Sequence, residues 1–175
     1  MMQIPVAEGL MPERATMRRA KQKLRRGRSA STAAGEFVRE EMDHIRDGKH
    51  GARSTKQAIA IGLSKARRAG VPLRPPRRGK PATQRSAARA YAIGQAPRKP
   101  RAPSKARSMA ATRALRREPH SAASPRALAT QAHEAAGQRT GTARKASARK
   151  AVRTKGPALR KAAARKAAAT RKRTA

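Results

Sequence analysis

Four histidines are the side chains of this sequence best suited to acid–base or metal chemistry. None has a cysteine companion, since the chain contains no cysteine, and none shows the spacing typical of zinc ligands. We interpret all of them as exposed linker residues, with a zinc site made by one or two of them as the minor alternative. They are His44, His50, His120 and His133.

Most of the acidic residues lie close together, and such a cluster can resemble an acid–base site. We expect instead that these carboxylates interact with a helix N-terminal dipole and pair with Arg39, Arg46 or the basic helix that follows. The sequence therefore predicts no catalytic residue, no enzyme activity and no cofactor. Activity that survives deletion of the basic tail would contradict this. The acids in question are Glu36, Glu40, Glu41, Asp43 and Asp47.

Positive charge is the dominant chemistry of the chain. Lysine and arginine number 45 against 9 aspartates and glutamates, which gives a formal net charge of +36 over 175 residues. Each cation that neutralises a phosphate releases a condensed counterion, so a phosphate polymer is the partner that this composition favours. We predict strong, sequence-tolerant and salt-sensitive binding to nucleic acid.

Duplex DNA is the favoured nucleic acid, because recognition of single strands and RNA loops relies on aromatic stacking and Phe37 and Tyr91 are the only aromatic residues. We predict a nucleoid-associated protein that condenses or protects DNA. An RNA- or ribosome-associated protein and a protein-interaction module localised by its basic tail stay open. The predicted phosphate-binding residues are Arg18, Arg19, Arg25, Arg26, Lys65, Arg67, Arg68, Arg77, Arg78, Lys80, Arg144, Lys145, Arg149, Lys150, Arg160, Lys161, Arg165, Lys166, Arg171, Lys172 and Arg173.

The tail, residues 74–175, holds 29 of the basic residues and only two acidic ones. Prolines and glycines cut it into short alanine-rich pieces whose like charges repel, so we predict a mostly disordered tail with short nascent helices. Its last basic pairs repeat every five residues, which turns a helix by about 140° and spreads charge around it. That pattern suits wrapping by nucleic acid and argues against a membrane-surface helix, which needs an apolar stripe.

Residues 34–73 are the segment that must organise the chain, because apolar residues, acids and helix stop signals occur together there. Either Phe37 or Val38, together with Met42 and Ile45, falls on one side of a helix that we place at 34–47. Gly48 and Gly51 then interrupt the helical pattern.

A second helix begins at Ser54, where Gln57 completes the spacing of a capping box, and ends at Gly70 before Val71 and Pro72. We predict an all-α fold: a helical hairpin at 34–73, preceded by a basic N-terminal arm at 1–33 that includes a helix. Ala58, Gly62 and Ala66 allow the partner helix to approach closely. The few large apolar side chains predict a marginal domain that gains stability from self-association or from its ligand.

Three segments resemble known proteins. The run KQAIAIGLSKARRAG, Lys56 to Gly70, resembles a short domain of uncharacterised bacterial proteins. This implies a bacterial or phage origin, and the family has no established activity to carry over. The tail resembles the Ala-, Lys-, Arg- and Pro-rich C-terminal domains of linker-histone-like bacterial DNA-binding proteins. Arg78 to Pro81 resembles an AT-hook core, but lysine replaces the second arginine, and we favour coincidence in so basic a chain.

The remaining composition predicts a protein of the bacterial cytoplasm. The lack of cysteine fits a reducing compartment, and no apolar run has the length of about 20 residues that a membrane span needs. The N-terminus lacks the basic and apolar regions of a secretion signal, and translation could begin at Met1, Met11 or Met17.

Overall fold

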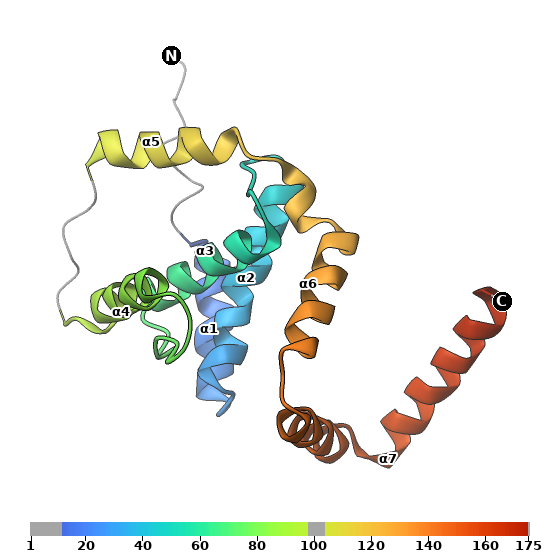
Figure 1. Cartoon of the computed structure of the whole chain (residues 1–175). Helices are drawn as coiled ribbons and strands as arrows, with labels where there is room; N and C mark the ends of the chain where they lie inside the picture. The colour runs from blue at the N-terminus through green and yellow to red at the C-terminus, as the bar shows by residue number, and fades with distance from the viewer. Residues whose placement is uncertain (1–11, 98–103, 175) are drawn as a thin grey trace. The chain divides into compact units, whose positions relative to one another are not determined.

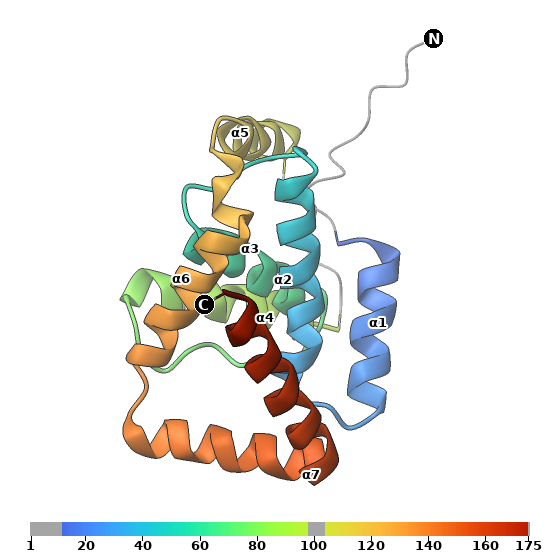
Figure 2. The ribbon, with the colours of Figure 1, turned by 90° about the vertical axis from the view of Figure 1, so that its right-hand side faces the viewer.

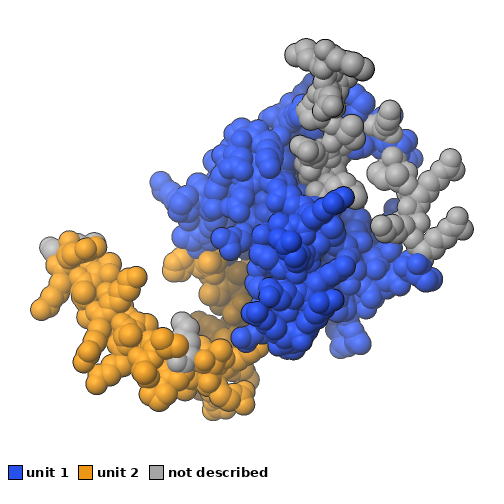
Figure 3. All heavy atoms as spheres, turned by 180° about the vertical axis from the view of Figure 1, so that it is seen from behind, with its two compact units in different colours: residues 1–131 blue, residues 132–175 orange. Residues whose placement is uncertain are grey.

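The computed structural model describes residues 12–97 and 104–174, which form helices joined by turns and contain no strand (Figure 1). The chain divides into two compact units, Met1–Gln131 and Ala132–Ala175, which Figure 3 colours separately. The helices in chain order are α1 (Arg14–Arg25), α2 (Ala30–Arg46), α3 (Thr55–Arg68), α4 (Pro81–Gln95), α5 (Lys105–Arg116), the 3-10 helix η1 (His120–Ala123), α6 (Pro125–Gly137) and α7 (Gly141–Thr174).

The predicted architecture of a small hairpin with a mostly disordered tail is wrong, although the described residues are all helical. Helices α2 and α3 do pack together, but α1 lies along α2, α4 packs on α3, and η1 contacts both α2 and α3 (Figures 1 and 2). The first unit is therefore a multi-helix assembly centred on α2 and α3. Its boundary after Gln131 also differs from the divisions at 33 and 73 that the sequence suggested.

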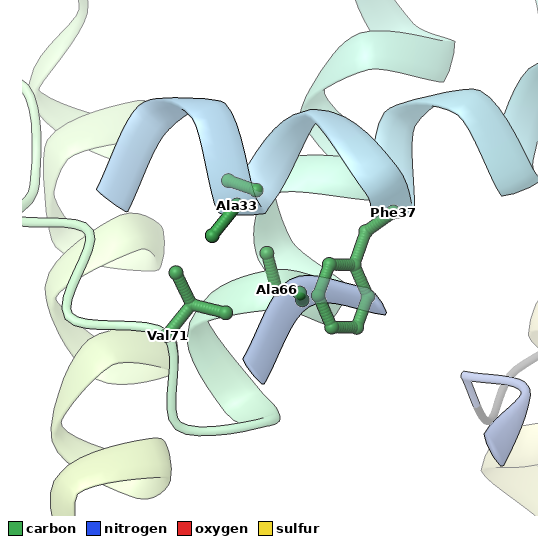
Figure 4. Close-up of a cluster of buried hydrophobic side chains, with 6 residues drawn as sticks. Ala33, Phe37, Ala66 and Val71 are labelled. Atoms are coloured by element: carbon green, nitrogen blue, oxygen red, sulfur yellow. The ribbon is translucent and has the colours of Figure 1, made fainter. Parts of the chain in front are cut away.

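One part of the core lies where α1, α2 and the end of α3 meet. Ala33 and Phe37 from α2 face Ala66 of α3 and Val71 from the segment after it (Figure 4). Helix α1 adds Ala20, with Met17 and Leu24 partly buried against the cluster. The part of the basic arm that forms α1 is therefore a packed helix with an apolar face.

A second part of the core joins the other end of α2 to α3 and η1. Met42 and Ile45 pack with Ala58, and Ala122 and Ala123 of η1 complete the cluster. The segment that leads into η1 is held beside the turn after α2 by two backbone hydrogen bonds. Gly51 N–H donates to the carbonyl of Leu115 at 2.9 Å, and Ala52 N–H donates to that of Pro119 at 3.0 Å. Residues that are far apart in the sequence therefore cover this end of α2.

Helix ends follow the predicted signals more closely than the overall architecture does. The Ser54 hydroxyl accepts a hydrogen bond of 3.2 Å from the backbone N–H of Gln57, which confirms the predicted cap of α3. The Gln57 side chain, however, accepts from the N–H of Arg53 rather than from that of Ser54. Helix α2 begins four residues before the predicted position, because Ser29 caps it by accepting from Thr32 N–H.

Close approach of α2 and α3 depends on Gly62, as the sequence predicted. A Cβ placed on Gly62 would lie 2.7 Å from Val38 Cα and 3.0 Å from Phe37 O, both rigid backbone atoms of α2. The two helices must therefore separate to admit even a methyl group.

We expect Gly62→Ala to lower the free energy of unfolding by about 1–3 kcal/mol, the usual cost of overpacking a core. The matched control is Gly35→Ala in α2, where nothing lies within 4 Å of the added Cβ. That variant should gain up to about 1 kcal/mol from helix propensity. Urea unfolding followed by circular dichroism measures both, and equal effects would contradict the close-approach interpretation.

The tail contains helices among its described residues, which corrects the expectation of disorder. Helix α7 continues from Gly141 to Thr174 with a single kink at Gly156, whose φ of 67° precedes Pro157. Alanine, lysine and arginine are all strong helix formers, and they occupy most of this segment. Local propensity therefore outweighs the self-repulsion on which the sequence argument relied.

Candidate functional site

The most extensive cationic surface of the second unit is α7. Ala132–Ala175 contains 14 lysines and arginines against a single acid, Glu134. Each predicted phosphate-binding side chain in α7 is exposed. None of the described α7 side chains is buried, so this helix presents positive charge around its circumference.

The first unit carries exposed cations at most of the other predicted positions. Those on α1 and in the turn after it alternate with the buried positions that face α2. Further exposed cations lie at the end of α3 and in the proline-rich segment that leads to α4. The exposed members are Arg18, Arg19, Arg25, Arg26, Arg68, Arg77, Arg78 and Lys80.

Lys65 and Arg67 do not lie on this surface, which corrects their predicted role. Lys65 is 2% exposed, and its Nζ lies 2.7 Å from Glu41 Oε2 in the interior. Arg67 is 8% exposed and donates from Nε to the carbonyl of Leu73 at 3.1 Å. Both face inward because α3 is covered by α2 and α4, and burial lowers the pKa of Arg67. They stabilise the fold and cannot reach phosphates.

The acidic residues of α2 pair with basic side chains, but mostly with different ones from those predicted. Arg46 does pair with Asp43 at 3.5 Å, and Glu41 pairs with the second hairpin helix through Lys65. Glu36 instead pairs with Lys23 and Arg19 of α1, the latter at 2.8 Å. No acid lies in the first turn of α2, so the expected interaction with the helix dipole is absent there.

The two basic side chains from α1 shift the pKa of Glu36 in a direction that can be tested. The hydrogen bond from Lys23, reinforced by Arg19, holds the pKa of Glu36 below its ordinary value of 4.5, although burial opposes this. A carboxyl whose pKa is lower in the folded state stabilises the protein above its unfolded pKa, and this contribution is lost as the pH falls through the folded pKa.

We therefore expect Glu36→Gln to destabilise the protein at pH 7 and to differ progressively less from the unsubstituted chain as the pH is lowered below about 4.5. Unfolding free energies at a series of pH values measure this difference. Gln138→Glu, at an exposed position just after α6, controls for a general effect of one carboxylate. A Glu36→Gln effect that is constant from pH 7 to strongly acidic conditions would contradict the assignment.

Two histidines are buried, contrary to the expectation of exposed linker residues. His44 and His50 are 3% and 4% exposed, whereas His120 and His133 are exposed as predicted. His44 Nε2 lies 3.1 Å from Glu13 Oε1, and this hydrogen bond lowers the pKa of Glu13.

The turn after α2 brings His50 back toward that helix. Gly48, with a φ of 72°, allows the chain to reverse, and the N–H of Lys49 bonds to the carbonyl of His44 at 3.0 Å. His50 thereby returns beside His44, with ring centroids 6.1 Å apart. The spacing of Glu41 and His44, one helical turn apart and followed by a glycine turn, was the sequence signal for this cluster.

The fold and these surfaces define a class only in general terms, as an all-helical and strongly cationic protein. Residues 27–78 match the model of a family of unknown function (DUF6496). The match spans α2, α3 and the proline-rich segment after them, which is less than half of the chain. Searches of curated proteins and of solved structures find no match. Among the described residues, no helix combines the length and apolar character needed to cross a bilayer.

Proposed function

We propose that the protein binds nucleic acid through electrostatic contacts with phosphates, that duplex DNA is the preferred form, and that the protein acts in the nucleoid to condense or protect DNA. The observation that carries the proposal is the exposure of cationic side chains all around α7. Acidic groups are few, and those of α2 are largely engaged with cations in the first unit. The cations of α7 therefore have little internal competition for phosphates.

The arrangement of charge on α7 favours contacts that do not depend on nucleotide sequence. The pairs Arg144–Lys145 and Arg149–Lys150 lie five residues apart before the Gly156 kink, and Arg160–Lys161 and Arg165–Lys166 lie five residues apart after it. Within each half of the helix the two pairs therefore point in different directions. One helix can then approach phosphates on both sides, which brings separate duplexes together. A helix that reads bases in a groove carries its contacting side chains on one face, and α7 does not have that arrangement.

Duplex DNA is preferred in this proposal because the chain offers no stacking platform. Tyr91 and Phe37 are the only aromatic residues, and Phe37 is 1% exposed in the core. Single strands and RNA loops bind largely by stacking of bases on aromatic side chains. Charge alone acts on the regular, closely spaced phosphates of a duplex.

Competition between nucleic acids tests the proposed preference. A fluorescent DNA duplex bound to the full-length protein is displaced by unlabelled duplexes of unrelated sequence, by single-stranded DNA and by a structured RNA at equal phosphate concentration. We expect unrelated duplexes to compete within about threefold of one another, and the single strand to compete less well. Stronger competition by the RNA would instead support a ribosome-associated role. A partner protein retained at high salt would support an interaction module.

A further inference from the structure

A group of three potential metal ligands is buried where α2 ends. Glu41, His44 and His50 are 0%, 3% and 4% exposed, and one ligand atom from each lies within 4.8 Å of those of the other two. Glu41 and His44 are one turn apart on α2, and the Gly48 turn supplies His50. Buried polar atoms normally have hydrogen-bond partners, so the partners of these side chains define what the site can do.

The hydrogen bond of His50 fixes which of its nitrogens is free. Its Nδ1 lies 3.1 Å from the carbonyl oxygen of Gly51, and because a carbonyl can only accept, Nδ1 carries the hydrogen. Nε2 of the neutral ring is then a bare lone pair. It lies 3.4 Å from Glu41 Oε1, which is also an acceptor, and neither atom has a hydrogen-bond partner. Two acceptors facing each other are stabilised by positive charge between them, which either a metal ion or a proton on His50 Nε2 would supply.

His44 presents a second lone pair by the same reasoning. Its Nε2 donates to the carboxylate of Glu13 at 3.1 Å, which leaves Nδ1 without a hydrogen in the neutral ring. Nδ1 is buried and has no hydrogen-bond partner among the described residues. Carboxylate and backbone carbonyl are the groups that typically orient metal-binding histidines through the opposite ring nitrogen.

We propose that Glu41, His44 and His50 bind a divalent transition-metal ion, with zinc as the best-suited common ion. Two imidazole nitrogens and a carboxylate oxygen match the ligands of zinc, whereas calcium and magnesium prefer oxygen ligands alone. The ion supplies positive charge between Glu41 Oε1 and the two imidazole nitrogens, beyond that of Lys65 on Oε2. It ties the end of α2 to the following turn, and with three protein ligands the fourth tetrahedral position would be taken by water.

Neighbouring charges are compatible with a divalent ion. Lys65 Nζ engages Oε2 of Glu41 at 2.7 Å, which leaves Oε1 directed to His50. The carboxylates of Glu13 and Glu40 lie in the same network, since Glu40 Oε1 accepts from the backbone N–H of Glu13 at 3.1 Å. Ligands of a tetrahedral zinc ion lie about 3.3 Å apart, so the widest pair must close by up to about 1.5 Å.

Metal titration of the full-length protein tests the proposal. The protein is first stripped with a chelator and then titrated with Co²⁺, whose visible absorption reports tetrahedral nitrogen and oxygen ligands, and with Zn²⁺ by calorimetry. We expect one ion per chain and a melting temperature that rises with Zn²⁺. Adventitious binding is disfavoured by the net charge of +36, which repels cations.

Variants separate the buried cluster from surface sites. His44→Ala and His50→Ala should each weaken binding by at least about a hundredfold, while His133→Ala, an exposed histidine of α6, should bind like the unsubstituted chain. Lys65→Met retains all three ligands and removes a competing cation, so it should bind about tenfold more tightly. Absence of stoichiometric binding and of a cobalt spectrum in the unsubstituted protein would overturn the proposal, even if the histidine variants fail to fold. Loss of binding in His133→Ala would do so as well.

Discussion

Glutamine substitution of the paired cations of α7 is expected to weaken duplex-DNA binding by at least about a hundredfold at about 100 mM salt, because each lost phosphate contact forfeits the release of a counterion. The variant replaces six exposed residues, which lie on both sides of the Gly156 kink. Glutamine has nearly the same helix propensity as lysine and arginine, so helix content should not change. The residues are Arg144, Lys145, Arg149, Lys150, Arg160 and Lys161.

A charge-preserving variant is the control for this experiment. Exchanging arginine for lysine and lysine for arginine at the same six positions keeps every positive charge, and it should retain affinity within about threefold. Fluorescence anisotropy with a labelled duplex measures all three proteins. If the glutamine variant binds as tightly as the unsubstituted chain, α7 is not the interface.

Removal of the buried amine of Lys65 is expected to cost about 3–5 kcal/mol of stability in the presence of a chelator. Lys65→Met leaves the carboxylate of Glu41, which is fully buried, without its cation. The loss should therefore far exceed that of Lys56→Met, a substitution of an exposed lysine on the same helix.

The double variant Lys65→Met with Glu41→Met distinguishes the charge effect from lost packing. Replacing a buried ion pair by apolar side chains of similar volume is often nearly neutral, so the second substitution should recover most of the lost stability. Chemical unfolding of the unsubstituted chain, of Lys65→Met, of Glu41→Met and of the double variant gives the coupling free energy between the two side chains. Additive losses from the two substitutions would show that Lys65 and Glu41 do not act as a pair.

Local signals in the sequence predicted the ends of the second hairpin helix and one of its contacts. Ser54 caps α3, and Gly70 ends it in a left-handed conformation with a φ of 88°. Gly62 lies against the backbone of α2. These features could be predicted because each depends on a few neighbouring residues whose backbone requirements are specific.

The extent of the fold could not be predicted from the large apolar residues, because the core is built mainly from alanine. Of the fourteen hydrophobic residues that are buried in the described part of the chain, ten are alanines, including Ala87 and Ala90 of α4. A Cβ on Gly94 would lie 1.7 Å from the carbonyl oxygen of Arg67, which shows how closely α4 approaches the end of α3. Small residues bury the helix backbones themselves, so a low content of large side chains did not prevent packing.

The buried charges and histidines were missed for a related reason. Charged residues are expected to be solvent-exposed by default, and Lys65 and Arg67 lie in the last turn of their helix, where cations are favoured. Lys65 is buried against Glu41 of α2, and Arg67 lies where α4 covers the end of α3. The burial of His50 depends on residues 115–119 returning to the chain at Gly51. Such contacts are distant in sequence. Met17, Ala20 and Leu24 fall at helical spacing, so the apolar face of α1 could have been recognised from the sequence, although it was not predicted.

The salt dependence of duplex-DNA binding by the full-length protein tests the central claim most directly. An electrostatic interface with about 6–10 phosphate contacts should lose affinity by about 10³–10⁵ between about 50 and 200 mM salt, with a linear plot of log affinity against log salt concentration. Failure to bind DNA at low salt, or an affinity that added salt does not change, would contradict the account.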